Sequence, residues 1–278
     1  MLSERLQIRL HGDARRPTLI YLPGVHGDWT LVSSFRAAVA GRVRFVEITY
    51  PRTLTWSLEE YAAAIEEALL SHGITRGWLL AESYGSQIAW PLCRDAAADP
   101  RRFQVDGLIL AGGFARHPMI WAVRLARALC GSLSMKWLNR WLVVYARYAR
   151  FRHRHAPETL ASIGEFVARR TELDCRAMLH RLRLIAENDP RPIAREVRLP
   201  VFFLAGLVDP IVPWLFVRWW LRRHCPGYRG GVMLWDADHN VLGTAPRACA
   251  AQVLAWIAGE AALGTPTGKS GLVESLNR

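Results

Sequence analysis

Short apolar segments alternate with amphipathic segments along most of the chain. The apolar segments have the length of β-strands, and they span residues 6–12, 18–24, 43–51, 77–82, 107–113, 200–206 and 231–239. The amphipathic segments have the length of helices, and they span residues 28–41, 57–73, 85–97, 214–224 and 246–260. Strands that alternate with helices are typical of a mainly parallel sheet flanked by helices, so the pattern predicts an α/β fold.

The alternation stops after residue 113 and resumes near residue 200. The intervening segment has no strand pattern and is rich in arginine and tryptophan at helical spacings. We therefore predict an α/β core formed by residues 1–113 and 196–260, with a helical insertion at residues 114–195. The polar residues 261–278 are expected to form a mobile tail.

The net charge of the chain is +12, from 36 Lys and Arg against 24 Asp and Glu residues. Much of this excess lies in the insertion, where nine basic residues and no acidic residue occur between Asp106 and Glu158. A helix over residues 136–154 would carry a line of cations formed by Lys136, Arg140, Arg147, Arg150 and Arg154. Such a stripe is either an ordinary solvated face or a docking surface for an acidic acyl carrier protein or an anionic membrane. No nucleic-acid recognition motif accompanies it, so a nucleic-acid partner is not expected.

Cysteine usage and hydropathy indicate the cellular setting. The five cysteines are scattered and form no CxxC pair, so neither a disulfide framework nor a metal cluster is expected. No uncharged apolar run approaches the roughly 18 residues of a membrane span. Residues 1–5 are polar, unlike a signal peptide. These features favour a cytoplasmic protein, with peripheral membrane attachment as an alternative, and no motif indicates a metal or a cofactor.

The segment GWLLAESYGSQIAW, residues 77–90, places a serine directly after an apolar strand. Ser83 has a small residue two positions before it and another two positions after it, Ala81 and Gly85. A sharp strand-to-helix turn needs small side chains at both positions, because the flanking backbone approaches closely. The turn would also place the N-terminus of the next helix beneath Ser83, where unpaired N–H groups favour an anion. Ser83 is therefore a candidate nucleophile, and the alternative is a simple helix cap.

A serine nucleophile needs a base, and the base needs a carboxylate that orients it. Asp209 follows the sixth apolar segment, and His239 closes the seventh. Asp236 and Asp238 are alternative acids. Asp238 adjoins His239 in sequence, and neighbouring residues rarely face each other across a hydrogen bond, while Asp236 fits a structural turn. Asp209 is therefore the preferred acid.

The order Ser83, Asp209, His239, with each residue at the end of a strand, resembles that of the α/β-hydrolase superfamily. The resemblance covers residues 6–260, and Ala81 departs from the first glycine of the usual G-x-S-x-G motif. Membership in this family implies an α/β-hydrolase fold and acyl transfer through an acyl-enzyme. A serine at the nucleophile position argues against the dehalogenase and epoxide hydrolase branches, which use aspartate there.

The same resemblance implies an oxyanion hole made of two backbone N–H groups. One would come from Tyr84, the residue after the nucleophile. The other would come from Val25 in the loop YLPGVHGDW, where Pro23-Gly24 replaces the His-Gly of the family. A plain glycine turn is the alternative reading of this loop.

A helical insertion at this place forms a cap over the acyl or alcohol pocket in the resembled family. The implied pocket residues are aromatic, and the candidates are Trp121, Trp137 and Trp141 in the insertion, together with Trp29 in the loop YLPGVHGDW. Packing onto the core is the alternative for each of them. The histidines of the insertion are expected to be solvated, and they are His117, His153, His155 and His180.

These features predict a carboxylesterase-like serine hydrolase that cleaves an ester or thioester of a hydrophobic acyl group. The fold alone cannot choose the substrate. A thioesterase, or an esterase for carrier-bound acyl chains, is an alternative of the same class, as are a C–C hydrolase and a cofactor-free perhydrolase. A non-catalytic ligand-binding member of the same fold is the alternative from another class.

Overall fold

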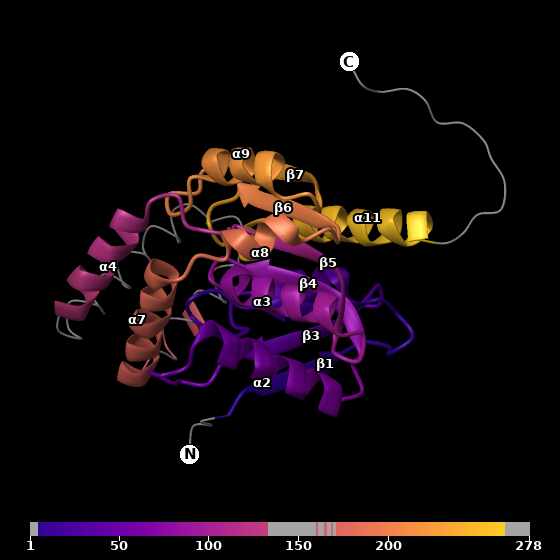
Figure 1. Cartoon of the computed structure of the whole chain (residues 1–278), viewed down its shortest axis with the longest axis horizontal. Coiled ribbons are helices and arrows are strands. Elements are labelled where there is room, and N and C mark those ends of the chain that lie inside the picture. Colours follow the sequence, from indigo (N-terminus) through magenta and orange to yellow (C-terminus); the bar gives the residue numbers. More distant parts are fainter. Residues whose placement is uncertain (1–4, 133–159, 161–163, 166–167, 169–170, 265–278) are drawn as a thin grey trace.

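A computed structural model describes residues 5–132, 160, 164–165, 168 and 171–264 (Figure 1). Its centre is a seven-stranded sheet in the order β1-β3-β2-β4-β5-β6-β7. The strands are β1 (Gln7–His11), β2 (Thr18–Leu22), β3 (Arg44–Thr49), β4 (Arg76–Glu82), β5 (Gln104–Ala111), β6 (Val201–Gly206) and β7 (Tyr228–Leu234). β1 is an antiparallel edge strand, and all other neighbouring pairs are parallel. The predicted mainly parallel sheet is confirmed.

Helices cover both faces of this sheet (Figure 1). One face packs against α2 (Leu58–Ser71), α3 (Gly85–Ala98), α8 (Arg191–Glu196) and α9 (Trp214–His224). The other face packs against α1 (Ser33–Val39), α10 (Val241–Thr244) and α11 (Pro246–Gly264). Successive strand residues point to opposite faces, so Leu79 belongs to the first core and Leu80 to the second. Burial on both faces explains why the strands read as continuous apolar runs.

Local signals set some boundaries of the helices. α2 begins where predicted, because the Ser57 N–H donates to the Glu60 carboxylate at 2.7 Å and the Glu60 N–H donates back to Ser57 Oγ at 3.2 Å. α1 begins at Ser33 rather than at residue 28. The Asp28 carboxylate accepts the Thr30 N–H at 3.0 Å, and this Asx-type contact holds a turn ahead of the helix.

Two boundaries near the C-terminus differ from the prediction. β7 ends at Leu234, where the Ala237 N–H donates to the Leu234 carbonyl at 3.3 Å and turns the chain. His239 therefore lies in a loop and does not close the strand. α11 extends to Gly264, so the predicted tail begins later than residue 261, and residues 265–278 lie outside the described part of the chain.

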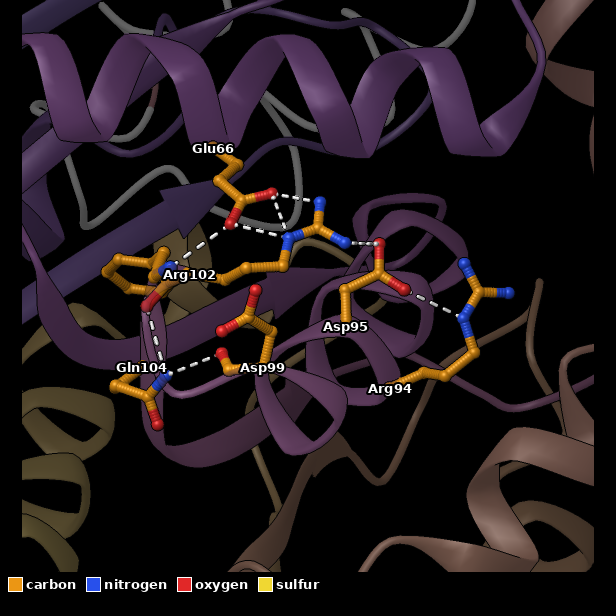
Figure 2. Close-up of polar contacts among 7 residues, drawn as sticks. Glu66, Arg94, Asp95, Asp99, Arg102 and Gln104 are labelled. Atoms are coloured by element: carbon orange, nitrogen blue, oxygen red, sulfur yellow. Dashed lines mark hydrogen bonds and ion pairs between the residues drawn. The ribbon is translucent and has the colours of Figure 1, made fainter.

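An ion-pair network secures the start of β5 (Figure 2). Arg102 donates to both carboxylate oxygens of Glu66 on α2 at 2.9 Å and lies 3.1 Å from the carboxylate of Asp95 on α3. Glu66 also accepts the Phe103 N–H at 3.1 Å. The network joins α2, α3 and the first residues of β5, at the end of the sheet opposite Ser83.

Three described helices lie in the predicted insertion, and they are α4 (Ile120–Ser132), α7 (Glu172–Glu187) and α8. α4 and α7 pack against each other beside the sheet (Figure 1). α7 also contributes Leu184 and Ile185 to the first core. The division into a core and a separate insertion stays a prediction, and the predicted cationic helix over 136–154 lies outside the described residues. None of the described helices is long and apolar enough to cross a lipid bilayer.

Candidate active site

Ser83 occupies a strained turn between β4 and α3. Its φ is +47°, and no other non-glycine residue in the described part of the chain has a positive φ. Such a backbone conformation costs roughly 1–3 kcal/mol and persists only where its surroundings hold it. Here the Ser83 N–H donates to the Ala111 carbonyl at 3.0 Å, and the Ser86 hydroxyl donates to the Ser83 carbonyl at 2.6 Å. The strained turn presents the Ser83 side chain beyond the end of β4.

Gly85 allows the nucleophile turn to touch the loop after β2. A Cβ at position 85 would lie 2.2 Å from the Leu22 carbonyl oxygen and 2.9 Å from that of Pro23. No larger residue fits without moving the backbone, as the sequence pattern predicted for this position. The contact sets the turn directly against the loop that carries the predicted oxyanion donor.

The structure joins Ser83, His239 and Asp209 in one chain of hydrogen bonds. His239 Nε2 lies 2.9 Å from Ser83 Oγ, and His239 Nδ1 lies 2.8 Å from Asp209 Oδ2. An ionised carboxylate can only accept, so Nδ1 carries the proton and Nε2 accepts from the Ser83 hydroxyl. The three residues follow β4, β7 and β6, so they meet at the carboxyl edge of the sheet. A serine nucleophile, a base and an orienting acid need this arrangement.

Asp209 is the acid that contacts His239. Its carboxylate is fully buried, and Oδ1 accepts the backbone N–H groups two and three residues further on, at 2.8 and 2.9 Å. These bonds fix the carboxylate so that Oδ2 points to the imidazole. The alternative acids lie elsewhere, because Asp236 is exposed and Asp238 accepts the N–H two residues after it at 2.9 Å.

The electrostatic surroundings favour the protonated form of His239. Burial alone would lower its pKa, because a buried cation loses hydration. The hydrogen bond to Asp209 and the charges of Asp209, Glu82 and Asp238 outweigh burial, so the pKa of His239 is raised above its ordinary value of 6.5. An imidazolium at this position is therefore stabilised.

His117 supports the loop that carries Asp209. The Met119 N–H donates to His117 Nδ1 at 3.1 Å, so Nε2 carries the proton and donates to the Ile211 carbonyl at 3.2 Å. Burial lowers the pKa of His117, which keeps the imidazole neutral. The expectation that His117 and His180 are solvated is wrong, because both side chains are buried.

The loop after β2, which contains Val25, lies against the turn at Ser83. A Cβ at Gly24 would lie 3.5 Å from the Ser83 Cβ, and Gly24, Val25 and Ser83 line the same cavity. Neither the Val25 N–H nor the Tyr84 N–H has a hydrogen-bond acceptor among the described residues. Both groups are therefore available to bind an oxyanion, and that role stays a prediction.

Arg181 of α7 holds this loop in place, and no pattern in the sequence predicts this contact. Its guanidinium donates to the carbonyls of Val25 at 2.8 Å and Pro51 at 3.1 Å, and it lies 5.4 Å from the Tyr50 ring centroid. Arg181 is 2% exposed. A Cβ at Gly27, whose φ is +81°, would lie 2.3 Å from the guanidinium. The glycine at position 27 is visible in the sequence, but the arginine that occupies the space beside it lies on a helix far along the chain.

A cavity of ≈ 370 Å³ contains the side chains of Ser83 and His239. Its apolar wall is formed by Val25, Leu31, Pro210 and Ile211, and its polar wall includes His26 and Glu82. A concave, mostly apolar site with a few polar groups suits a small organic ligand.

The predicted aromatic pocket residues do not line this cavity where they are described. Trp29 lines a neighbouring cavity, with the Arg9 guanidinium 4.0 Å from its ring centroid, because the turn at Gly27 carries it away from Ser83. Trp121 is 67% exposed on the outer side of α4. The substrate-binding role of Trp29 and Trp121 stays a prediction, whereas Trp137 and Trp141 lie outside the described residues.

Glu82, which precedes Ser83, is held by other side chains of the protein. The Tyr21 hydroxyl donates to its carboxylate, and His26 Nε2 lies 3.8 Å from the same carboxylate. No group of three or more His, Cys, Asp or Glu side chains that could hold a metal ion occurs in the described part of the chain.

Comparisons with known proteins agree with this architecture. No protein-family model and no curated protein matches the sequence. MGS-M2, an alpha/beta hydrolase enzyme from a Medee basin deep-sea metagenome library, is 12% identical, with 98% of this chain and 97% of that chain covered and a TM-score of 0.74. The enol-lactonase from Burkholderia xenovorans LB400 is 19% identical over 91% of this chain and 96% of its own, with a TM-score of 0.73. A thermophilic esterase from Thermogutta terrifontis is 17% identical over 92% and 93%, with a TM-score of 0.71. The chain therefore has the α/β-hydrolase fold.

Proposed function

We propose that the protein is a serine hydrolase that cleaves an ester of a hydrophobic acyl group through an acyl-enzyme. The observation that carries this proposal is the hydrogen-bonded chain from Ser83 through His239 to the buried Asp209. The esterase and the enol-lactonase that share its fold support ester hydrolysis in general terms.

The reaction follows from the geometry of the three side chains. Ser83 Oγ attacks the ester carbonyl carbon while its proton moves to His239 Nε2. The tetrahedral intermediate collapses, and the leaving alcohol takes the proton from His239. A water molecule then attacks the acyl-enzyme, gives its proton to His239, and releases the acid as Ser83 Oγ regains a proton. Asp209 keeps the Nδ1–H tautomer and stabilises each imidazolium.

Negative charge develops on the substrate carbonyl oxygen in both halves of the reaction. The N–H groups of Val25 and Tyr84 would donate to it from a preorganised position, and such donors supply much of the catalysis of acyl transfer. The Gly24 carbonyl accepts the Gly27 N–H at 3.0 Å, which fixes the peptide group that contains the Val25 N–H. The buried guanidinium of Arg181 adds positive potential on the same side.

The cavity supports a compact, hydrophobic acyl or alcohol group. Its volume of ≈ 370 Å³ lies near the lower end of the range for small-molecule sites, about 300–1,000 Å³. Ester and thioester substrates have the same electrophilic carbon, so a thioesterase remains an alternative of the same class. A carrier-bound substrate would add an acidic carrier protein as a partner, with the arginine-rich segment 136–154 as its predicted contact.

A fluorophosphonate probe and a graded substrate panel test this function. The probe should label the wild type and not Ser83→Ala, because phosphonylation needs an activated serine oxygen. On p-nitrophenyl esters and acyl thioesters of increasing length, Ser83→Ala should lower kcat/KM by about 10³-fold or more. The matched control is Ser71→Ala, which removes an exposed serine of α2 whose hydroxyl contacts the Ala68 carbonyl and His72 Nδ1, away from Ser83.

Equal labelling of the wild type and Ser83→Ala would refute the nucleophile assignment. Absence of both labelling and turnover, with retained binding of an apolar ester, would favour the non-catalytic ligand-binding alternative. Faster turnover of thioesters than of matched esters would select the thioesterase alternative.

A further inference from the structure

Helix α9 presents large apolar side chains to solvent. Leu215, Phe216 and Trp219 are 63%, 64% and 60% exposed, whereas Val217 and Leu221 on the opposite side are buried in the first core. Leu215 and Trp219 lie one helical turn apart on the same face. Exposed apolar groups in such a cluster mark interaction surfaces more often than isolated ones do.

The same face of α9 is positively charged in its second half. Arg222 and Arg223 are exposed, and they line one surface hollow together with Leu215, Arg218 and Trp219. The sequence contains no acidic residue between Asp209 and Asp236. The face therefore combines an apolar first half with a cationic second half, without a carboxylate of its own helix to neutralise it.

A groove beside α9 is also lined by both apolar and cationic side chains. Phe216 and Trp219 line it with Arg116 and Arg191, and its volume is ≈ 200 Å³. Both arginines pair with the single carboxylate of Asp189, each at 2.6 Å. One negative charge against two positive charges leaves this flank cationic as well.

The exposed apolar surface reaches the cavity that holds Ser83. Ile211, in the loop between β6 and α9, lines that cavity and is also 54% exposed. Trp235, which follows β7, is 78% exposed, and Val208, which follows β6, is 47% exposed. β6 and β7 are parallel neighbours, so both loops lie at the edge of the sheet where Ser83 lies (Figure 1).

We propose that the α9 surface, formed by Ile211, Leu215, Phe216, Trp219, Arg222 and Arg223, docks on an anionic lipid bilayer. The bilayer interface accepts both halves of the surface, because apolar side chains enter the boundary between headgroups and acyl chains while arginines pair with anionic headgroups. A second copy of the chain fits poorly, since a two-fold contact would set these arginines against their own counterparts. An acidic protein would neutralise the arginines, but it would need its own apolar groove for three projecting side chains.

Docking has a consequence that rests on the proposed function. With Ile211 at the rim of the cavity, a docked molecule would hold the Ser83 site next to the lipid surface. The substrate class would then be an acyl ester that partitions into the bilayer, and such an ester would reach Ser83 without crossing bulk water.

Vesicle binding tests docking separately from catalysis. Vesicles of phosphatidylcholine alone and of phosphatidylcholine with about 30% phosphatidylglycerol are sedimented with Ser83→Ala protein, so the readout needs no activity. The parent should bind the anionic vesicles about tenfold or more above the neutral ones, and added salt should weaken the binding. Arg222→Glu/Arg223→Glu should remove this binding, and Phe216→Ser/Trp219→Ser should weaken it at unchanged charge.

Each control variant makes the same kind of change in charge or hydropathy as an α9 variant, but on another surface of the protein. Arg16→Glu/Arg42→Glu makes the same charge change at exposed positions near the opposite edge of the sheet, and Leu70→Ser removes an exposed leucine of α2. These variants should bind vesicles as the parent does. In the Ser83 wild-type background, the α9 variants should keep their melting temperature and their kcat/KM on a short soluble ester, and lose rate only on a vesicle-presented ester.

Three results would overturn the proposal. Vesicle binding that survives both α9 variants would assign docking to another segment. If the protein did not bind vesicles but formed a concentration-dependent dimer, and the α9 variants were monomeric, the surface would be assigned to a second copy of the chain. No vesicle binding, with capture by an acidic acyl carrier protein that Arg222→Glu/Arg223→Glu abolishes, would assign it to a protein partner.

Discussion

Arg181 is a buried cation with no carboxylate within ion-pair distance in the described part of the chain. Burial of an unpaired charge costs free energy, because the charge loses its hydration. Hydrogen bonds to two carbonyls and the facing ring of Tyr50 offset this cost for Arg181. Those contacts hold the Val25 carbonyl, in the peptide group next to the one that carries the Val25 N–H, and none of them involves the side chains of Ser83 and His239. Arg181 is thus a positioning residue for the predicted oxyanion donor.

We expect Arg181→Met to lower kcat by about tenfold or more with little change in KM, because a displaced oxyanion donor acts mainly in the transition state. Steady-state kinetics on a short soluble ester measures the two constants. Affinity for a boronic acid, which forms a tetrahedral adduct with Ser83, should fall in parallel with kcat/KM. Added guanidinium should restore part of the rate in Arg181→Ala.

The matched control is Arg183→Met, which removes an arginine of the same helix whose side chain is 46% exposed and lies near Glu187. It should leave kcat unchanged. A rise in KM alone in Arg181→Met, with an unchanged affinity for the boronic acid, would contradict the positioning role.

At the scale of elements, the sheet and its helices follow from patterns that the sequence shows directly. Strand-length apolar runs, the Ser57 cap of α2 and the small residues around Ser83 depend on contacts close in sequence, so they could be predicted. Asp209 and His239 could be predicted because parallel strands bring their carboxyl ends to one edge. The late start of α1 was missed because an Asp28 turn competes with the helix.

The residues missed at the site depend on packing between distant segments. Arg181 and His117 contact carbonyl groups of loops that lie far from them in sequence, and no local periodicity encodes such contacts. Trp29 was assigned to the pocket from its place in the early loop, but the direction of a side chain after a glycine turn depends on the folded neighbours. The sequence alone could therefore not show which of these side chains lie at the site.

The Arg102 network is the clearest case in which single side chains join elements. We expect Glu66→Ala to reduce the free energy of unfolding by about 1–3 kcal/mol, because it leaves the buried Phe103 N–H without its acceptor. Arg102 is partly exposed, so solvent limits the ion-pair share of this effect. Urea denaturation measures the change, and kcat/KM should stay the same because the network lies opposite Ser83.

Glu67→Ala serves as the comparison, since it removes an exposed carboxylate from the same helix. Its effect should stay within about 0.5 kcal/mol. Glu66→Gln keeps an acceptor for the Phe103 N–H and should fall between the two. Equal unfolding energies for Glu66→Ala and Glu67→Ala would show that the network does not stabilise the fold.

At the scale of the whole molecule, Asp189 connects the loop after β5 to α8 through Arg116 and Arg191. Burial alone would raise the pKa of this carboxyl, but hydrogen bonds from Arg191 and Arg116 outweigh it and lower the pKa to about 2 from 3.8. A depressed pKa in the folded state means that the ionised form stabilises the fold above the unfolded value. That contribution is lost as the pH falls from about 3.8 through about 2.

Asp189→Asn should therefore lower the free energy of unfolding by about 1 kcal/mol at pH 7, after allowing for partial exposure of the pair. The difference between wild type and variant should be constant above about pH 5 and shrink toward pH 2. Denaturant unfolding at several pH values measures it. A difference that stays constant down to pH 2.5 would rule out the ionised pair as its source.

The contact between Gly27 and Arg181 limits which segments of this protein can be exchanged for those of a relative. The guanidinium occupies the space that a side chain at position 27 would need, so the loop after β2 and helix α7 fit each other as a matched pair. A chimera that receives the region 114–195 from a relative without an arginine at position 181 would lose that guanidinium and keep a loop shaped around it. Helix α7 and the loop beside Ser83 therefore depend on each other for their packing. Grafting experiments in this fold would need to transfer residues 23–27 and 171–187 as one unit.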